Sequence, residues 1–309
     1  MVSPASWRRK NESTSAFGMN VLLFFHRLFG NGAVRIIAWF ASWFVWIFNK
    51  NVRRISDDYL KNLKASASEK GIKLGRLSSR RHIYAFCRSV AGKIVSWSGQ
   101  TDFGDVGEID GGLTRSLKRT ESPEPLMIIG AHIGNMEVLR AFNTSRIHKT
   151  VNVLMHMQNS TVFMEYLNKL NRDSSLNIIS TADISPDISM ELAERTSRGE
   201  WVSMMGDRLL DDSTRYVEVD FLGKKARFPQ GPWIMASILK IPVSVMLGLT
   251  DDDGVKVYYR ELGAVRLDRK NREESIRGYV REYAAELENI LYAYPYEWFN
   301  FYDFWSHDR

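Results

Sequence analysis

The sequence predicts an α/β fold, in which helices flank a central mixed sheet, with an N-terminal helical segment that associates with a membrane. Two observations lead to this prediction. Beyond residue 113, short apolar runs alternate with amphipathic stretches, and before residue 57 the chain is basic and rich in Trp and Phe. The chain has 309 residues, enough for a large core, and its single cysteine, Cys87, excludes an internal disulfide.

The expected strands are short apolar runs, many of them β-branched, and the expected helices have apolar residues at helical spacing. The strands cover residues 126–131, 151–156, 176–180, 201–206, 216–222, 242–249 and 255–262. The helices cover residues 134–144, 159–172, 186–199, 230–240 and 272–292. Such alternation is typical of a sheet covered by helices. The acidic run DDDG, residues 251–254, predicts a hairpin turn between the last two strands rather than a metal site.

The chain divides into three predicted segments. Residues 1–56 are the basic, Trp-rich, membrane-associating segment. Residues 57–112 contain a helical pattern up to residue 98, followed by a linker rich in glycine and acidic residues. Residues 113–309 form the predicted α/β core.

Basic charge is concentrated in the first third of the chain. Residues 1–100 carry 17 Lys and Arg against 4 Asp and Glu, a net charge of +13, whereas residues 101–309 carry 25 against 32, a net charge of −7. A nucleic-acid-binding protein would combine its basic residues with a recognition helix or a stacking platform. Here they flank apolar runs at 19–25 and 36–48 instead, and the acidic core argues against a nucleic-acid partner.

The run IIAWFASWFVWIF, residues 36–48, has thirteen residues without a charge. About 20 apolar residues are needed to span a bilayer. A Trp-rich run with basic neighbours such as Arg35 and Lys50 suits the membrane interface. The alternative is a buried helix of a soluble domain.

The stretch GAHIGNMEV, residues 130–138, follows an expected strand and places His132 in the turn before a helix. Reactive groups of α/β folds often lie at such strand ends. Glu137 lies five positions later, and it can reach His132 only if His132 precedes the regular helix. A carboxylate bonded to one imidazole nitrogen leaves the other free to accept a proton. A purely structural histidine is the competing interpretation.

Two further stretches favour a reactive site. The sequence GDR ends the expected strand 201–206, so Asp207 and Arg208 should lie at the same sheet edge as His132. The stretch FLGKKARFPQGPWIMA, residues 221–236, predicts a tight loop leading into a helix. Arg208 and Arg227 are candidates for binding phosphate or carboxylate, although ordinary surface ion pairs would also explain them.

The ordered set of GAHIGNMEV, MMGDR, FLGKKARFPQGPW, a Pro-Val strand and PYEWFNFYDFW (295–305) resembles the lysophospholipid acyltransferase superfamily. It is most similar to the branch that contains the late acyltransferases of lipid A biosynthesis. The resemblance covers roughly residues 124–305, and its signature is a His followed after four residues by Asp or Glu. His132 and Glu137 match this signature. Met136, Ala226 and Gln230 depart from the branch's usual pattern, which puts the acceptor in doubt more than the reaction.

The resemblance implies transfer of a fatty acyl group from a thioester, on acyl carrier protein or coenzyme A, to a hydroxyl or amine of a lipid-like acceptor, without a bound cofactor. It implies that His132 is the general base and Glu137 its orienting partner. Asn135, Asp207 and Arg208 would help bind or polarise the substrates. The later loop, with Arg227, Phe228, Pro229 and Gly231, would shape the donor or acceptor site.

The implied location is the cytoplasmic face of a bacterial inner membrane. A non-catalytic lipid-binding protein with the same fold is the main alternative, and a metal-dependent hydrolase or glycosyltransferase is the next. The aromatic cluster WFNFYDFW, residues 298–305, fits either a core element or a segment resting on the membrane.

Overall fold

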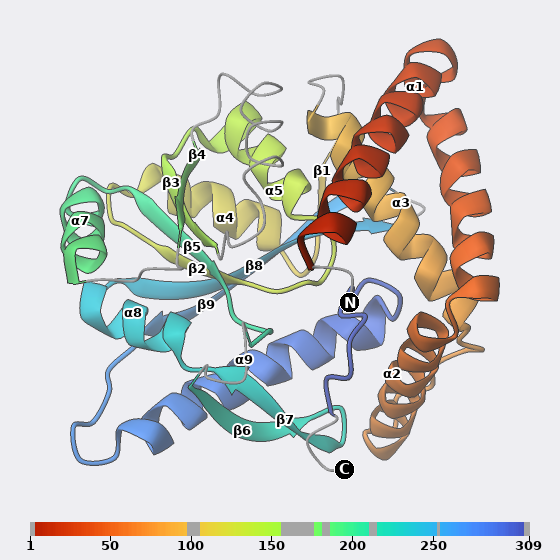
Figure 1. The fold of residues 1–309 in the computed structure, drawn as a ribbon. Helices are drawn as coiled ribbons and strands as arrows, with labels where there is room; N and C mark the ends of the chain where they lie inside the picture. The colour runs from red at the N-terminus through yellow and green to blue at the C-terminus, as the bar shows by residue number, and fades with distance from the viewer. Residues whose placement is uncertain are drawn as a thin grey trace.

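The computed structural model describes residues 4–97, 106–155, 176–180, 186–209, 215–251 and 254–305. A seven-stranded sheet lies between two layers of helices, and an N-terminal group of helices packs at one end of it (Figure 1). The predicted fold class, a mixed sheet flanked by helices, is confirmed.

The sheet has the strand order β1-β9-β8-β2-β5-β3-β4. Strand β2 pairs in parallel with both β5 and β8, whereas β8 and β9 are antiparallel. A separate antiparallel hairpin, β6–β7, packs against helix α9. The strands are β1 (Val106–Glu108), β2 (Met127–Gly130), β3 (Val151–Met155), β4 (Leu176–Ser180), β5 (Trp201–Met205), β6 (Tyr216–Phe221), β7 (Lys224–Pro229), β8 (Pro242–Asp251) and β9 (Gly254–Ala264).

Helices come from both the N-terminal region and the core. They are α1 (Pro4–Phe48), α2 (Lys50–Glu69), α3 (Ser79–Trp97), α4 (Gly112–Glu121), α5 (Met136–Phe142), α7 (Pro186–Ser197), α8 (Gly231–Leu239) and α9 (Arg272–Ala293), with a π-helical turn η1 (Asn143–Ile147) after α5. Helix α2 runs unbroken through residues 56 and 57, the boundary between the first two predicted segments. That division stays a prediction.

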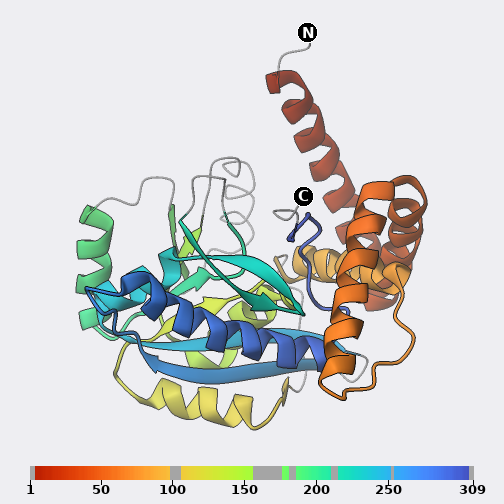
Figure 2. The ribbon, with the colours of Figure 1, turned by 90° about the horizontal axis from the view of Figure 1, so that it is seen from below.

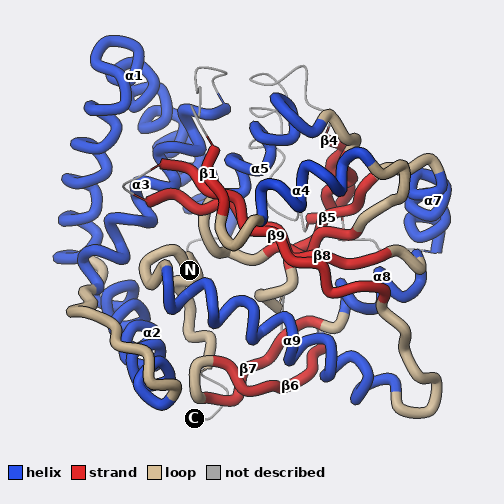
Figure 3. The backbone as a smooth tube through the Cα atoms, turned by 180° about the vertical axis from the view of Figure 1, so that it is seen from behind, coloured by secondary structure: helices blue, strands red, loops and turns tan. Residues whose placement is uncertain are grey.

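The side chains of β2 and of the residue before it point alternately to the two faces of the sheet, and both faces are buried. Leu126 and Ile128 pack in one cluster with residues of α5, and the side chains of α4 pack against that cluster. Met127 and Ile129 belong to the larger cluster, which includes α8, α9 and the β6–β7 hairpin. Successive strand residues point to opposite faces, so a fully apolar strand can serve both layers. Figure 3 shows α4 and α5 on one side of the strands and α8 and α9 on the other.

Each of the seven predicted strands is present. Strand β1 and helix α4 were not predicted, and residues 224–229 form strand β7 rather than the predicted loop. The residues of β7 pair in register with β6, and its buried Ala226 and Phe228 hold it against the core. The predicted hairpin at 251–254 is confirmed by the pairing of Asp251 with Gly254. The predicted helix at 159–172 lies outside the described residues.

Helix α1 bends sharply at Gly30, whose φ of 66° and ψ of −157° are not helical. The two arms of α1 therefore run in different directions, as Figures 1 and 2 show. Helix α1 packs against α3, where Leu22 and Val34 contact Ala91 and Val95. The second arm, residues 31–48, is about 27 Å long at 1.5 Å per residue, slightly less than the roughly 30 Å of a bilayer's hydrocarbon core.

The outward face of α1 is apolar and exposed. Residues Val21–Phe48 are long and apolar enough to cross a membrane by length and composition, although the bend at Gly30 divides them. The exposed apolar side chains recur every three or four residues, opposite the buried Val34 and Ala38. They are Phe24, Phe25, Leu28, Phe29, Ile36, Trp39, Phe40, Phe44, Ile47 and Phe48. This face is consistent with the predicted membrane association.

Candidate active site

Two strand ends bring the central pair of the site together. Gly130, the last residue of β2, is in register with Met205, the last residue of β5. His132 and Asp207 each follow two residues later, so they emerge side by side from neighbouring parallel strands. The prediction that Asp207 and His132 share a sheet edge is confirmed.

Asp207 binds His132 through both carboxylate oxygens. Its Oδ1 lies 2.8 Å from Nδ1 of the imidazole, and its Oδ2 accepts a hydrogen bond from the main-chain N–H of His132 at 2.9 Å. Because an ionised carboxylate can only accept, Nδ1 carries the proton and Nε2 of the neutral ring has a free lone pair. The His132 side chain is 29% exposed, and within the described part of the chain Nε2 has no hydrogen-bond partner.

The Asp207 carboxylate is fully buried but well supplied with donors. Besides His132, the amide of Asn300 donates to Oδ2 at 2.9 Å and the indole N–H of Trp298 donates to it at 3.3 Å. Burial by itself would raise the pKa of this carboxyl group. The positive charge of His132 when its ring is protonated, the hydrogen bonds that His132 donates and the nearby Arg208 nevertheless hold the pKa of Asp207 below its ordinary value. The carboxylate is therefore ionised at neutral pH.

Arg208 extends this network by one residue. Its Nε and Nη2 donate to Oδ1 of Asn300 at 3.2 and 2.6 Å, which fixes the amide orientation that lets Asn300 donate to Asp207. The guanidinium also lies 5.2 Å from the centre of the Tyr302 ring. Arg208 is thus held beside the His132–Asp207 pair by contacts of the C-terminal segment.

Backbone hydrogen bonds fasten this C-terminal segment, residues 295–305, to the turn that carries His132. The N–H of Phe299 donates to the carbonyl of His132 at 2.7 Å, and the N–H of Gly134 donates to the carbonyl of Glu297 at 2.8 Å. Ile133 and Trp298 form an antiparallel bridge. The turn residues cannot move without the segment that also holds Asp207.

Gly134 is required by the shape of the turn. Its φ is +72°, a conformation that residues with a side chain rarely adopt, and an added Cβ would lie 2.1 Å from the carbonyl oxygen of Gly248. The next residue, Asn135, donates its N–H to that same oxygen and caps α5 by accepting from the N–H of Glu137 at 3.1 Å. The glycine therefore lets the turn approach β8 closely.

The structure corrects the predicted partner of His132. Glu137 lies in the first turn of α5, and its carboxylate accepts from Nε of Arg140 at 2.6 Å. Asp207, bound to Nδ1, is the orienting carboxylate in place of the expected Glu137. The physical reason is that Glu137 belongs to a regular helix that begins at Met136, whereas Asp207 emerges directly beside His132.

Four other predicted site residues have no contact with this pair in the described residues. Arg227 lies on β7, where its Nε is 3.8 Å from Glu218 Oε2 and its guanidinium covers the Tyr216 ring at 4.5 Å. Phe228 is fully buried and packs in the core. Pro229 ends β7 and Gly231 begins α8. The stretch that leads from β7 to α8 thus belongs to the β6–β7 hairpin and the core. This hairpin lies on the side of α9 that faces away from β8 and β9 (Figure 1).

Sequence reasoning missed two residues of the network, Trp298 and Asn300. Both belong to the aromatic cluster 298–305, which is a core element in the structure: Trp298 is 1% and Phe304 4% exposed. An amide inside a run of aromatic residues is the signal that could have identified Asn300, because a buried amide needs hydrogen-bond partners.

A buried histidine links this segment to the N-terminal helices. His82 on α3 donates from Nε2 to the carbonyl of Trp298 at 2.7 Å, and its Nδ1 lies 2.8 Å from the hydroxyl of Ser56 on α2. Burial lowers the pKa of His82 to about 4, against a smaller opposing effect of the Trp298 carbonyl. His82 is therefore neutral at pH 7 and joins α2 and α3 to the segment that holds Asp207.

Among the described residues, the geometry supplies a base, His132, but no nucleophilic side chain hydrogen-bonded to it. The ionised Asp207 fixes the ring of His132 and would stabilise the imidazolium that forms when Nε2 accepts a proton. Cys87, on α3, has a pKa raised to about 11 by burial, which keeps it a thiol. The arrangement is suited to deprotonating a hydroxyl or amine supplied by a substrate.

Comparison with known proteins gives an independent result. The sequence matches no curated protein. A family model described as bacterial lipid A biosynthesis acyltransferase matches residues 111–306, which include the whole seven-stranded sheet apart from β1 and each residue of the His132–Asp207 network. That match extends over more than half of the chain and agrees with the resemblance seen in the motifs. The chain belongs to the family of bacterial lipid A biosynthesis acyltransferases.

Proposed function

We propose that the protein transfers a fatty acyl group from an acyl thioester to a hydroxyl or amine of a lipid-like acceptor, with His132 as the general base. Family membership supports an acyltransferase with a lipid acceptor. The observation that carries the catalytic assignment is the 2.8 Å contact between His132 Nδ1 and Asp207 Oδ1, which leaves Nε2 available to accept a proton.

The proposed reaction proceeds through a tetrahedral intermediate. Nε2 of His132 takes the proton from the acceptor's hydroxyl or amine as that atom attacks the thioester carbonyl carbon. The intermediate collapses with cleavage of the C–S bond, and the imidazolium returns the proton to the departing thiolate. Asp207 stabilises the imidazolium between these two steps, because its pKa is low enough for it to stay ionised.

Negative charge on the carbonyl oxygen must be stabilised during the attack. Arg208 is the proposed donor from a side chain, since it lies within the network and two of its nitrogens already hold Asn300. Backbone N–H groups are the other proposed source. Asn135 caps α5 directly after the turn and would contact the acceptor. In the later stretch, the partly exposed Arg227 is the proposed contact with the substrate, and the buried Phe228 supports it from the core.

Glu137 keeps a place in the proposal despite its different partner. It pairs with Arg140 and also attracts the charge of Lys93 on α3. Burial lowers the pKa of Lys93, and the negative charge of Glu137 opposes part of that effect. We propose that Glu137 supports catalysis by fixing the first turn of α5 against α3. Its removal should reduce turnover.

The proposed setting is the cytoplasmic face of a bacterial inner membrane. The apolar outer face of α1 would lie at the membrane, and acyl carrier protein or coenzyme A would deliver the acyl group from the cytosol without a bound cofactor. The basic charge of the first 100 residues, +13, would attract this region to anionic lipid.

Comparative lipid analysis tests the proposal. Bacteria would express the wild type, His132→Ala or the matched control His148→Asn, an exposed histidine in a left-handed backbone conformation that Asn tolerates. A new acylated lipid should appear with the wild type and with His148→Asn, and should fall on the order of 10²–10⁴-fold with His132→Ala at equal protein level. The same lipid at full level with His132→Ala would overturn the mechanism. Identical lipid profiles in every strain would favour the non-catalytic lipid-binding alternative.

A further inference from the structure

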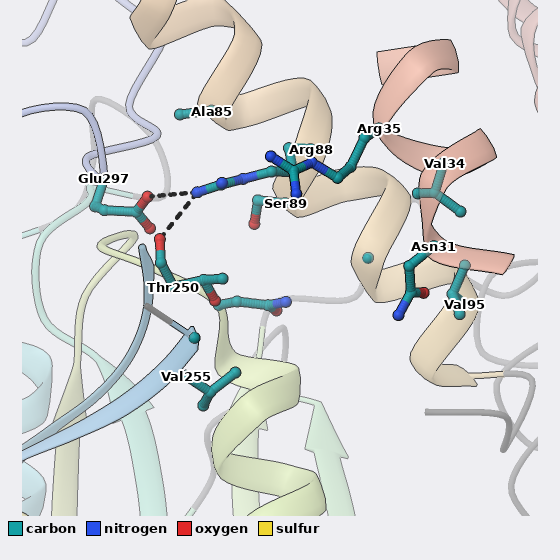
Figure 4. Close-up of a pocket in the computed structure, with 13 residues that line it drawn as sticks. Asn31, Val34, Arg35, Ala85, Arg88, Ser89, Val95, Thr250, Val255 and Glu297 are labelled. Carbon is teal, nitrogen blue, oxygen red and sulfur yellow. Dashed lines mark hydrogen bonds and ion pairs between the residues drawn. The ribbon is translucent and has the colours of Figure 1, made fainter. Parts of the chain in front are cut away.

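A pocket lies where the N-terminal helices meet the core. Its volume is about 270 Å³, and it lies between α1, α3 and the end of the sheet at which β8 turns into β9 (Figure 4). Asn135, three residues after His132 in the catalytic turn, is one of its lining residues. The pocket is therefore next to the proposed active site and shares Asn135 with it, whereas His132 and Asp207 do not line it.

Among the described residues that line this pocket, positive charge exceeds negative charge. They include two arginines, Arg35 on α1 and Arg88 on α3, and one carboxylate, Glu297. Arg88 donates to the carbonyl of Thr250 at 3.0 Å and lies 3.9 Å from Glu297. Arg35 has no ion-pair partner within the described residues, and in Figure 4 its side chain extends toward that of Arg88. The excess charge favours an anionic ligand.

A hydroxyl in the same pocket has no hydrogen bond to any described residue. Oγ of Ser89 is buried and has no partner among the residues that the structure describes, although most buried polar atoms are satisfied. Ser89 follows Arg88 directly on α3 and lines the pocket with it. A hydroxyl beside two guanidinium groups can donate to an oxygen of a phosphate or a carboxylate.

The pocket also has an apolar part, next to the exposed apolar face of α1. Val34, Ala85, Val95 and Val255 form this part, whereas Asn31, Asn135 and Thr250 are polar members of the lining. Arg35 and Val34 come from the first turns after the bend at Gly30, between the exposed Phe29 and Ile36. A ligand with both an anionic group and hydrocarbon fits this lining better than a free anion does.

We propose that this pocket binds the anionic head group, a phosphate ester or carboxylate, of an amphiphile that enters from the membrane, and that this amphiphile is the acyl acceptor. The anionic group contacts Arg35, Arg88 and Ser89, and hydrocarbon lies against Val34 and Val95. That the amphiphile is the acyl acceptor rests on the proposed function. That the pocket binds an anionic amphiphile rests only on the residues that line it.

Native mass spectrometry of the full chain in detergent micelles tests the binding. The probes are didecanoyl phosphatidylglycerol, which is anionic, didecanoyl phosphatidylcholine, which has the same chains and no net charge, and inorganic phosphate. The wild type should bind one phosphatidylglycerol about tenfold or more tightly than phosphatidylcholine. Arg35→Gln and Ser89→Ala should each weaken that binding several-fold to about tenfold. The matched control Arg81→Gln, an exposed arginine of α3 outside the pocket, should leave it unchanged.

Three results would overturn the proposal. Equal affinity for the two lipids would show that the pocket does not recognise net negative charge, because both lipids carry a phosphate ester and only phosphatidylglycerol is a net anion. Binding by Arg35→Gln and Ser89→Ala at the wild-type level would place the lipid elsewhere. Strong binding of inorganic phosphate without binding of phosphatidylglycerol would show a free-anion site instead of an amphiphile site.

His132→Ala separates this proposal from the proposed function. This variant should lose acyl transfer and keep phosphatidylglycerol binding, because His132 does not line the pocket. If His132→Ala stays active while the lipid binding behaves as described, the mechanism fails and the pocket stands. If transfer requires His132 but Arg35→Gln leaves the KM for the acceptor unchanged, the mechanism stands and the pocket is not the acceptor site.

Discussion

Asp207 holds His132 at two points, with Oδ1 on the imidazole Nδ1 at 2.8 Å and Oδ2 on the main-chain N–H at 2.9 Å. The carboxylate therefore determines both where the residue's backbone lies and which nitrogen of its ring carries the proton. Trp298 and Asn300 fix the carboxylate in turn. A side chain held in this way loses little conformational freedom when it accepts a proton, which suits a general base.

Asp207→Asn should reduce turnover on the order of 10²–10⁴-fold. The amide keeps the size of the side chain but loses the charge that stabilises the imidazolium, and it can present an N–H to Nδ1 and so favour the wrong tautomer. Acyl transfer would be measured in membranes that contain equal amounts of folded protein.

Asp220→Asn is the control for this change. Asp220 forms an ion pair with Lys225 at 2.8 Å on the exposed side of the β6–β7 hairpin, where losing one charge should cost little. Turnover by Asp207→Asn within a few-fold of the Asp220→Asn level would contradict the assigned role of Asp207.

The sequence was sufficient to predict the strands that build the site. Apolar runs before GAH and GDR predicted two strands that end at the same sheet edge, and the structure pairs these strands as parallel neighbours in register. The identity of the carboxylate on His132 was not predictable from spacing. Glu137 is near in sequence but is fixed on a helix, whereas Asp207 is 75 residues away and reaches Nδ1 because β5 pairs with β2.

Strand β7 was missed for a related reason. Lys224 and Lys225 are exposed and Pro229 ends the strand, so the sequence KKARFP reads as a loop. Its partner β6 alternates clearly, and pairing with β6 determines the conformation of β7. Likewise, Asn300 joins the site only because residues 297–300 lie beside the turn that carries His132. The local sequence pattern does not reveal such a long-range contact.

Gly134→Ala should destabilise the protein by at least about 2 kcal/mol, because the left-handed conformation and the contact with the Gly248 carbonyl both disfavour a Cβ. Turnover should fall further than stability alone explains, since the turn that carries His132 must shift. The thermal midpoint and the specific activity of the folded fraction would be measured together. Gly75→Ala is the control, because a Cβ there meets no atom within 4 Å; an equal effect of both substitutions would contradict the requirement at Gly134.

The stability of the protein should fall as the pH drops from about 6.5 to about 4, in part because of His82. The unfolded histidine binds a proton near its ordinary pKa of 6.5, whereas the folded one binds it only near 4. Between these values the unfolded state holds more protons, so the free energy of unfolding rises with pH across the window, by roughly 3 kcal/mol for this group.

His82→Gln should remove this part of the pH dependence, since Gln does not titrate. Unfolding would be followed at pH 7, 5 and 4 in one detergent, with His148→Gln as the control at an exposed position. A pH dependence in His82→Gln as steep as in the wild type would show that His82 is not the group responsible.

Membrane attachment should depend on the exposed face of α1. Phe40 and Phe44 are 64% and 65% exposed and lie one helical turn apart on that face. Replacing both with Ser should weaken binding to vesicles of phosphatidylethanolamine and phosphatidylglycerol on the order of 10²–10⁴-fold, because each buried Phe contributes roughly 1.5–3 kcal/mol. Met190→Ser with Ile238→Ser is the control, since these side chains are also exposed and apolar but lie on α7 and α8. Co-sedimentation would measure the binding. If the control pair releases the protein and the α1 pair does not, the membrane contacts the core instead, and the pocket beside Arg35 would lie away from the lipid surface.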